Sequence, residues 1–110
     1  MITKGNIFSK PEFKVGEPEL FEVLRQNDNI LIERIITNGA LKKPGEWYDQ
    51  DKDEWVILVR GEAKIEFQDG NISSLQNGDY IFIPAHLKHR VVATSESPDC
   101  IWLAIHGDLS

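Results

Sequence analysis

The sequence has little cysteine, no long apolar run and a deficit of positive charge. Cys100 is the only cysteine among 110 residues, so no disulfide can form within the chain. No apolar run approaches the roughly 20 residues that a membrane-spanning helix needs, and the first residues lack the basic-then-apolar pattern of a signal peptide. The 12 Lys and Arg stand against 18 Asp and Glu, and a net charge of −6 argues against broad contact with nucleic acid or anionic lipid. We therefore expect a cytoplasmic protein with no nucleic-acid or membrane partner.

Helical signals are also lacking. No stretch of ten or more residues combines helical periodicity with a capping signal. Alternating and β-branched runs separated by turn residues instead predict eight strands, at 21–25, 30–37, 54–59, 63–68, 72–75, 80–84, 90–94 and 100–106. Asp69-Gly70 and Asn77-Gly78 are strong turn signals between them. Many short strands joined by turns favour an all-β sandwich or barrel.

The N-terminal residues differ from the rest of the chain. Residues 1–20 contain Pro11 and Pro18 and predict an irregular arm, with one short edge strand near Ile7-Phe8, ahead of a single domain at 21–110. Within that domain the alternation of apolar residues changes parity across Gly61, as a β-bulge would produce.

Two segments, 45–62 and 78–89, contain the spacings that point to a family. In the first, six residues separate Glu54 from Gly61. In the second, Gly78, Pro84 and His89 follow the pattern Gly-x5-Pro-x4-His. Together these spacings resemble the two motifs of the cupin superfamily, over about residues 40–106. The resemblance implies a single antiparallel jelly-roll barrel.

The resemblance also implies a divalent metal such as Fe, Mn, Ni or Zn, held at the barrel mouth by three His and one Glu. Glu54 and His89 stand at two of these four positions, whereas Tyr48 and Gln50 stand where the first motif has its histidines. His86 replaces a glycine of the second motif. The family's metal set is therefore incomplete in this chain.

Other side chains of the chain could complete the set. Gln50 could ligate through its carbonyl oxygen, and His106 lies on the last predicted strand with a parity that could face the interior. We therefore predict Gln50, Glu54, His89 and His106 as metal ligands, and Tyr48 and His89 as the catalytic acid–base residues. The alternative for His106 is a structural histidine that is hydrogen-bonded inside the barrel.

Three functions remain open at this point. The first is a metal-dependent enzyme, of dioxygenase or isomerase type, that acts on a small polar molecule in the barrel mouth. The second is a metal-free barrel that binds a small molecule, as a sensor or accessory protein. The third is a metal-free isomerase or epimerase in which His89 and Tyr48 form the acid–base pair.

Alternation also gives expectations for the surface. If Glu54 points inward, Trp55, Ile57 and Val59 point outward and form an apolar strip, for which a sheet-on-sheet homodimer is the economical explanation. Trp47 is the tryptophan we expect at the pocket, because it flanks Tyr48. We expect Arg34 to be a surface residue, and an inward Arg34 that binds a ligand anion is the alternative.

Overall fold

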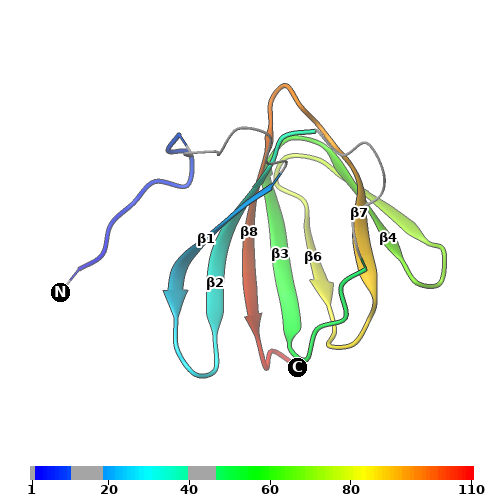
Figure 1. Ribbon diagram of the computed structural model, residues 1–110, viewed down its shortest axis with the longest axis horizontal. Coiled ribbons are helices and arrows are strands. Elements are labelled where there is room, and N and C mark those ends of the chain that lie inside the picture. The colour runs from blue at the N-terminus through cyan, green and yellow to red at the C-terminus, as the bar shows by residue number, and fades with distance from the viewer. Residues whose placement is uncertain (1, 11–18, 40–46) are drawn as a thin grey trace.

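Eight strands form two antiparallel sheets in the computed structural model, which describes residues 2–10, 19–39 and 47–110 (Figure 1). The strands are β1 (Glu19–Gln26), β2 (Leu31–Thr37), β3 (Asp53–Arg60), β4 (Ala63–Phe67), β5 (Ile72–Leu75), β6 (Tyr80–Ile83), β7 (His89–Thr94) and β8 (Cys100–Gly107). Each begins and ends within two residues of its predicted bounds, and the all-β prediction is confirmed. The described residues contain no apolar helix of membrane-spanning length.

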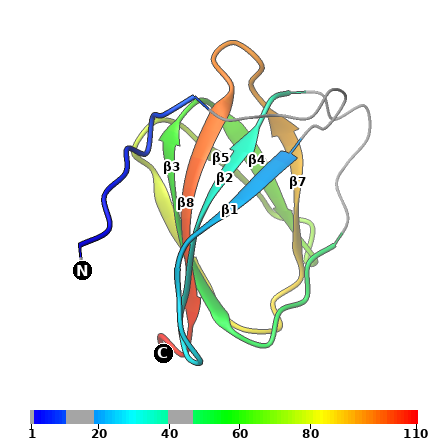
Figure 2. The same cartoon turned by 60° about the vertical axis from the view of Figure 1, so that its left-hand side comes forward.

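The two sheets face each other and enclose the core, as the turned view in Figure 2 shows. One sheet has five strands in the order β1-β2-β8-β3-β6, and the other has three in the order β5-β4-β7. Alternate side chains of each strand point between the sheets, as the period-two sequence pattern requires. The buried core consists of Val56, Leu58, Ala63, Ile65, Leu75, Ile83, Cys100, Trp102 and Ala104. This arrangement is the predicted jelly-roll barrel.

The change of parity at Gly61 has a different cause from the one predicted. Gly61 lies between β3 and β4, where the chain passes from one sheet to the other, and its φ is +112°. A Cβ at this position would lie 2.6 Å from Sγ of Cys100, so only glycine fits without displacement. The bulge itself is within β3, between Leu58 and Arg60, opposite β8. The prediction of a bulge at Gly61 was therefore wrong in its position.

The predicted edge strand near Ile7-Phe8 is a turn. Oδ1 of Asn6 accepts a hydrogen bond of 2.7 Å from the backbone N–H of Phe8, and the carbonyl of Asn6 accepts one of 3.0 Å from Ser9. An Asn side chain that bonds the backbone two residues onward competes with strand pairing, which is why the apolar pair did not form a strand. Pro11 and Pro18 lie outside the described residues.

Asp53 joins the end of β8 to the loop between β6 and β7. Its carboxylate accepts hydrogen bonds from the backbone N–H of Ala85 and Leu109, both of 2.9 Å, and from the hydroxyl of Ser110 at 2.8 Å. These hydrogen bonds, led by the one from Ala85, lower the pKa of Asp53. The loop that precedes His89 is thereby fixed to the five-stranded sheet.

Candidate functional site

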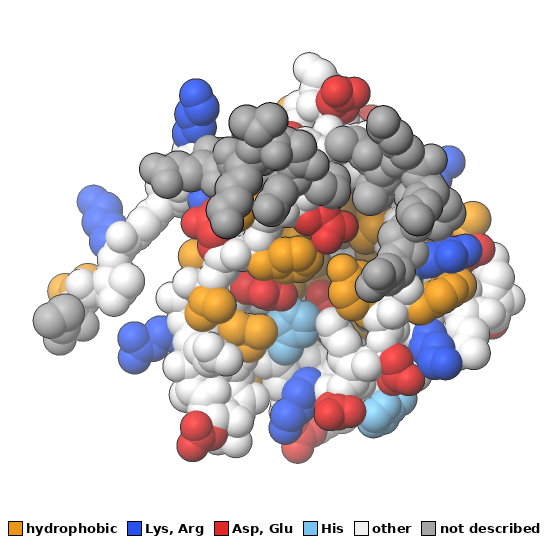
Figure 3. Space-filling view, in the orientation of Figure 1, with side chains coloured by type: hydrophobic (Ala, Val, Ile, Leu, Met, Phe, Trp, Pro, Cys, Tyr) orange, Lys and Arg blue, Asp and Glu red, His pale blue; other side chains and the backbone are white. Residues whose placement is uncertain are grey.

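A cavity of about 80 Å³ opens between the two sheets. Four of the predicted site residues line it, namely Tyr48, Gln50, Glu54 and His89. The rest of the lining is mostly apolar, and consists of Glu19, Phe21, Ile35, Thr37, Val56, Ile65, Ile83, Val91 and Trp102. Figure 3 shows a hollow in this face, where a histidine and acidic side chains lie among hydrophobic ones. A mostly apolar cavity that brings a few polar groups together is the usual form of a ligand site.

The central contact of the cavity joins Glu54 of β3 to His89 of β7. Oε1 of Glu54 lies 3.4 Å from Nε2 of His89, and the two side chains are 9% and 8% exposed. Nδ1 of His89 donates a hydrogen bond of 2.9 Å to the carbonyl of Leu87, because a carbonyl can only accept. The Nε2 atom is therefore the one that exchanges protons with Glu54 or with a ligand.

The surroundings of His89 favour its charged form. Burial lowers the pKa of this imidazole, but the hydrogen bond that His89 donates to Glu54, the one that it donates to Leu87 and the negative charge of Glu54 together outweigh it. The pKa of His89 is raised as a result. The charged form of His89 is therefore favoured relative to that of a free imidazole, and its Nε2 lies beside the carboxyl group of Glu54.

Tyr48 is fixed to His89 through the backbone. The N–H of Tyr48 donates to the carbonyl of His89 at 2.7 Å, and the N–H of His89 donates to the carbonyl of Tyr48 at 3.2 Å. Directly paired residues of this kind place their side chains on the same face, and the two ring centroids are 5.7 Å apart. The predicted acid–base residues Tyr48 and His89 thus lie side by side.

Gln50 is held in the cavity wall by the loop between β6 and β7. The backbone carbonyl of Gln50 accepts a hydrogen bond of 2.8 Å from the backbone N–H of His86. His86 has a φ of +66°, the left-handed conformation for which glycine is usual, and glycine is the residue that the second motif has at this position. The side chain of His86 is exposed and lies 3.1 Å from Oδ1 of Asp49. His86 therefore belongs to the rim.

His106 faces the interior but is bonded away from the cavity. Its Nε2 donates a hydrogen bond of 2.9 Å to Oε1 of Glu33 and lies 4.0 Å from Oε2 of Glu54. The hydrogen bond to Glu33 raises the pKa of His106 against the opposing effect of burial, and the charges of Glu54 and Glu33 add to the increase. The interior position of His106 agrees with the predicted parity. Its hydrogen bond to Glu33 agrees with the alternative, in which His106 is a structural histidine that is hydrogen-bonded inside the barrel.

Two acidic residues near the site were missed in the sequence. Glu33 alternates with Ile35 and Thr37, and that parity was the available signal that it faces inward. Glu19 lines the cavity and its pKa is raised by burial, although the sequence predicts that residues 1–20 form the N-terminal arm. Neither residue belongs to a motif, so spacing alone could not reveal them.

The chemistry of these side chains does not fit a divalent transition metal well. In residues 2–10, 19–39 and 47–110, no three His, Cys, Asp or Glu are placed to hold an ion together. A phenol and a neutral amide are weaker donors than the imidazoles they replace at Tyr48 and Gln50. The predicted metal set stays a prediction: the cavity brings Gln50, Glu54 and His89 together, while His106 is bonded to Glu33.

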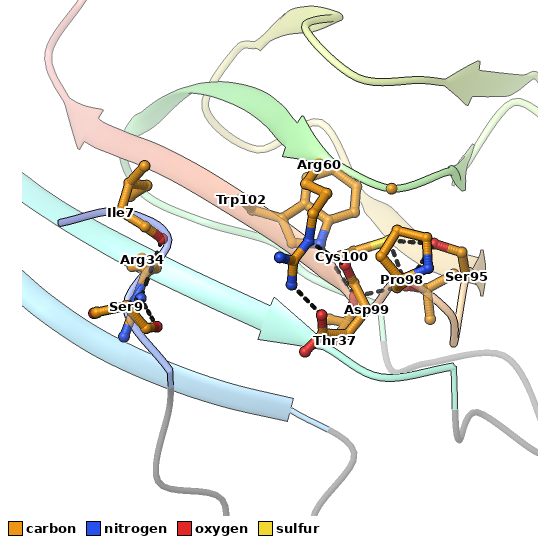
Figure 4. Close-up of polar contacts among 12 residues, drawn as sticks. Ile7, Ser9, Arg34, Thr37, Arg60, Ser95, Pro98, Asp99, Cys100 and Trp102 are labelled. Carbon is orange, nitrogen blue, oxygen red and sulfur yellow. Dashed lines mark hydrogen bonds and ion pairs between the residues drawn. The ribbon is translucent and has the colours of Figure 1, made fainter.

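Arg34 is neither a surface residue nor a cavity residue. It is only 4% exposed, yet it lies on the outer side of β2, where it forms an ion pair with Glu22. Its guanidinium donates to the carbonyls of Ile7 and Ser9, at 3.1 and 2.7 Å, as Figure 4 shows. The expectation of a surface Arg34 was therefore wrong, because the N-terminal arm covers it.

Trp47 lies outside the cavity. Its ring is stacked against the guanidinium of Arg90, 4.3 Å from the ring centroid, and Arg90 forms an ion pair with Glu66. Neighbouring residues of an extended chain point to opposite sides, so the inward Tyr48 directs Trp47 outward. Trp102 is instead the tryptophan of the cavity wall, where its Nε1 donates to Oγ1 of Thr37 at 3.2 Å.

Comparisons with known proteins agree with this fold. Residues 35–106 match the family model of the cupin domain. A solved structure from Ralstonia eutropha JMP134, named a "putative mannose-6-phosphate isomerase", is 40% identical, with a TM-score of 0.84 and coverage of 97% of this chain and 99% of that one. No curated protein sequence matches the chain.

More distant structures share the fold alone. A cupin superfamily protein from Desulfitobacterium hafniense DCB-2 is 22% identical, with a TM-score of 0.73 over 89% of this chain and 84% of that one. The enzyme HppE, solved with FeII and its substrate, is 12% identical, with a TM-score of 0.68 over 79% of this chain and 52% of that one.

Proposed function

The chain belongs to the cupin domain family, and on that premise we propose that it catalyses proton transfer on a small molecule bound in the barrel cavity. The buried pair of Glu54 and His89 is the observation that carries this proposal. Two titratable groups of opposite charge, in contact with each other and facing one apolar cavity, are suited to general acid–base catalysis.

In the proposed reaction, the Glu54 carboxylate removes a proton from the carbon next to a substrate carbonyl. The imidazolium of His89 donates its Nε2 proton to the carbonyl oxygen, and the electron pair of the broken C–H bond forms the double bond of an enediol. Glu54 then returns its proton to one of the two carbons of the enediol, and the neutral His89 takes back a proton from an enediol oxygen, which re-forms a carbonyl. The product is an isomer or an epimer, with no net oxidation. Tyr48 and Gln50 line the same cavity and would bind substrate hydroxyl groups.

The lining favours an uncharged substrate. No Lys or Arg belongs to the part of the cavity wall that the structure describes, whereas Glu19 and Glu54 both do. A phosphate or carboxylate in this cavity would meet two carboxyl groups, and the one imidazole of the lining, His89, is already in contact with Glu54. We therefore propose a neutral hydroxycarbonyl compound as the substrate class, in contrast to the phosphorylated substrate that the name of the Ralstonia eutropha protein gives.

Two other functions have specific support. A metal-dependent form of the enzyme is supported by the oxygen and nitrogen donors of Gln50, Glu54 and His89 in one cavity. A non-catalytic binding barrel is supported by the mostly apolar lining. Metal content and turnover separate the three functions. The metal-dependent enzyme requires both bound metal and turnover, the metal-free enzyme requires turnover alone, and the binding barrel requires neither.

The test is exchange of carbon-bound protons into deuterated water, followed by NMR over a panel of neutral aldoses, ketoses and shorter hydroxycarbonyl compounds. The wild type should label one compound, and Glu54→Gln and His89→Asn should each slow labelling by about 100-fold or more. The variant Trp47→Phe, outside the cavity, serves as the matched control. A compound that binds but is not labelled would support the non-catalytic binding barrel and contradict the proposed proton transfer.

We also propose that two copies associate through the outer face of the five-stranded sheet. There Trp55 and Ile57 of β3 pair with Phe82 and Tyr80 of β6, and Tyr80 and Phe82 are 67% and 44% exposed. The first residues of the arm support this proposal, since they extend away from the barrel in Figure 1, ahead of Ile7 and Ser9, which contact Arg34. Residues 2–10 carry two Lys and no Asp or Glu, which gives the arm a charge of +2. Because the whole chain carries −6, the rest of the chain carries −8. A second copy would offer the arm a surface of opposite charge.

A further inference from the structure

We infer that Thr37 forms a second polar end of the cavity, where its hydroxyl oxygen accepts a hydrogen bond from a hydroxyl group at the far end of the substrate. The inference deepens the proposed function and rests on it, since it takes the reacting carbonyl to lie at Glu54 and His89. It makes Thr37 a specificity-determining residue that selects a hydroxyl donor.

Strand register places Thr37 at the opposite end of the cavity from Glu54. Glu54 of β3 is directly opposite His106 of β8, and His106 is directly opposite Leu31 of β2. Thr37 is the last residue of β2, six residues beyond Leu31. Glu54 and Thr37 both line the cavity, and the apolar Ile35 lines it next to Thr37 on the same face of β2. A substrate hydroxyl that reaches Thr37 is therefore remote from the reacting carbonyl.

A chain of four hydrogen bonds holds the hydroxyl of Thr37. Its Oγ1 lies 3.2 Å from Nε1 of Trp102 and 2.6 Å from Oγ1 of Thr94. Sγ of Cys100 lies 3.0 Å from Oγ1 of Thr94 and 3.2 Å from the carbonyl oxygen of Glu62. Figure 4 shows Thr37, Cys100 and Trp102 close together. These three side chains are almost fully buried, so their polar atoms depend on the chain of bonds.

Only one direction of donation satisfies all four bonds. An indole N–H can only donate and a carbonyl can only accept, so Trp102 is the first donor and Glu62 the last acceptor. The hydroxyls of Thr37 and Thr94 and the thiol of Cys100 have one proton each, and each must donate it to the next group along the chain. The proton of Thr37 is therefore donated to Thr94.

Ser95 does not change this direction. Its Oγ lies 3.3 Å from Sγ of Cys100, but it donates its own proton to the carbonyl of Pro98 at 2.8 Å. The oxygen of Thr37 has one lone pair in addition to the one that accepts from Trp102. Toward a molecule in the cavity Thr37 can therefore only accept. A hydroxyl group fits this oxygen, whereas an ether oxygen would face it with no proton between the two.

Glu19 is the other polar side chain at this end of the cavity. It is directly opposite Thr37 on β1, and both residues line the cavity. Directly opposite residues place their side chains on the same face, so the Glu19 carboxyl group is the competing partner for a substrate hydroxyl. The test therefore has to separate Thr37 from Glu19.

Binding of a matched series of probes tests the inference without reference to turnover. The probes are hydroxyacetone derivatives extended at the methyl end by alkyl chains of several lengths, each ending in a hydroxyl, a methoxy or a methyl group. Binding is followed by NMR through the indole N–H signal of Trp102, because that N–H donates to Thr37. Trp47→Phe and Trp55→Phe identify the other two indole signals, which should not move.

At one chain length the hydroxyl probe should shift the Trp102 signal and bind about 10-fold or more tightly than the methoxy probe. This comparison uses the wild type alone, so it decides the inference even if a variant fails to fold. Equal affinity for the hydroxyl and methoxy probes, or no shift with any probe, would overturn the inference.

Variants separate the acceptor from its neighbours. Thr37→Val should weaken binding of the hydroxyl probe about 5-fold, to that of the methyl probe, whereas Thr37→Ser should retain it. Thr94→Val frees the proton of Thr37, which can then be donated to a probe, so binding of the methoxy probe should strengthen about 5-fold. Glu19→Gln should keep the preference for hydroxyl over methoxy.

Two results would reassign or separate the claims. A preference that is lost in Glu19→Gln and kept in Thr37→Val would overturn the inference and assign the hydroxyl to Glu19. If the probes bind as expected but none is labelled in deuterated water, the proposed proton transfer fails and the hydroxyl site stands. If a probe is labelled without any preference for the hydroxyl end, the inference fails and the proposed function stands.

Discussion

Oε1 of Glu54 and Nε2 of His89 lie 3.4 Å apart, although one residue belongs to the five-stranded sheet and the other to the three-stranded sheet. The contact is therefore a point where the two sheets meet through polar groups within an otherwise apolar interior. Its position beside Tyr48 in one cavity makes it the centre of the proposed chemistry. The neighbouring Glu33 and His106 extend the same polar row into the sheet.

The first prediction concerns the effect of pH on stability. The pKa values of His89 and His106 are both raised above their usual 6.5 in the folded chain. A raised pKa means that the folded state binds protons more tightly than the unfolded state, so this contribution is fully present below pH 6.5 and is lost as pH rises through the folded values. Urea unfolding at a series of pH values should show a free energy of unfolding that falls above pH 6.5.

His106→Gln should make this fall shallower, because one of the two groups is removed. The matched control is His86→Gln, which changes an exposed histidine on the rim. An unfolding free energy that rises over the same interval, or an identical slope in His106→Gln, would contradict the assignment.

The second prediction concerns the passage between the sheets at Gly61. Gly61→Ala introduces both a left-handed backbone conformation for alanine and a Cβ 2.6 Å from Sγ of Cys100. We expect a loss of about 2–4 kcal/mol in the free energy of unfolding, from backbone strain and the clash together. Gly70→Ala is the comparison, since Gly70 has a φ of +90° but no atom within 4 Å of an added Cβ. Its cost should be limited to about 1 kcal/mol of strain. Equal losses of unfolding free energy in Gly61→Ala and Gly70→Ala would show that the contact with Cys100 does not contribute.

The third prediction concerns the hydrogen bonds of Asp53. Because the pKa of Asp53 is lowered in the folded chain, its stabilising contribution is present above the unfolded value of 3.8 and is lost as pH falls below it. Asp53→Asn should therefore remove part of the acid sensitivity of the wild type, measured by circular dichroism during acid titration. The exposed Asp69→Asn serves as the control, because among the described residues the carboxylate of Asp69 accepts its hydrogen bonds from Asn71, within its own turn. An acid transition unchanged in Asp53→Asn would refute the prediction.

The fourth prediction concerns the proposed homodimer. At micromolar concentration the wild type should sediment at about twice its chain mass of 12.6 kDa. Phe82→Glu places a charge in the outer apolar strip and should give a monomer with the same far-ultraviolet circular dichroism. Ile72→Glu is the matched control, because Ile72 is exposed on the other sheet. A wild type that sediments as a monomer would contradict the proposal.

The sequence predicted the strands well because period-two alternation and turn residues act locally. Asp69-Gly70, for example, marks its hairpin turn without reference to the rest of the chain. The family motifs likewise identified Glu54 and His89, and these two side chains do face each other. Parity also correctly placed Trp55 on the face opposite Glu54.

The errors arose where a side chain's partner is distant in sequence. Arg34 is buried by the arm, 25 residues away at Ser9, and no local pattern records that contact. Glu33 bonds to His106 across 73 residues, so its inward position depends on how β2 and β8 pair. The change of parity at Gly61 was real, but a change of sheet and a bulge leave the same trace in the sequence.

The most direct test of the central claim is the rate of deuterium incorporation into the labelled compound, measured on chelator-treated protein with and without added Zn²⁺, Mn²⁺ or Fe²⁺. The account predicts full exchange activity after chelation, no increase with any of the metals, and loss of activity in Glu54→Gln. Exchange that disappears with the chelator and returns with one of the metals would contradict it, and would establish the cavity as a metal-dependent site.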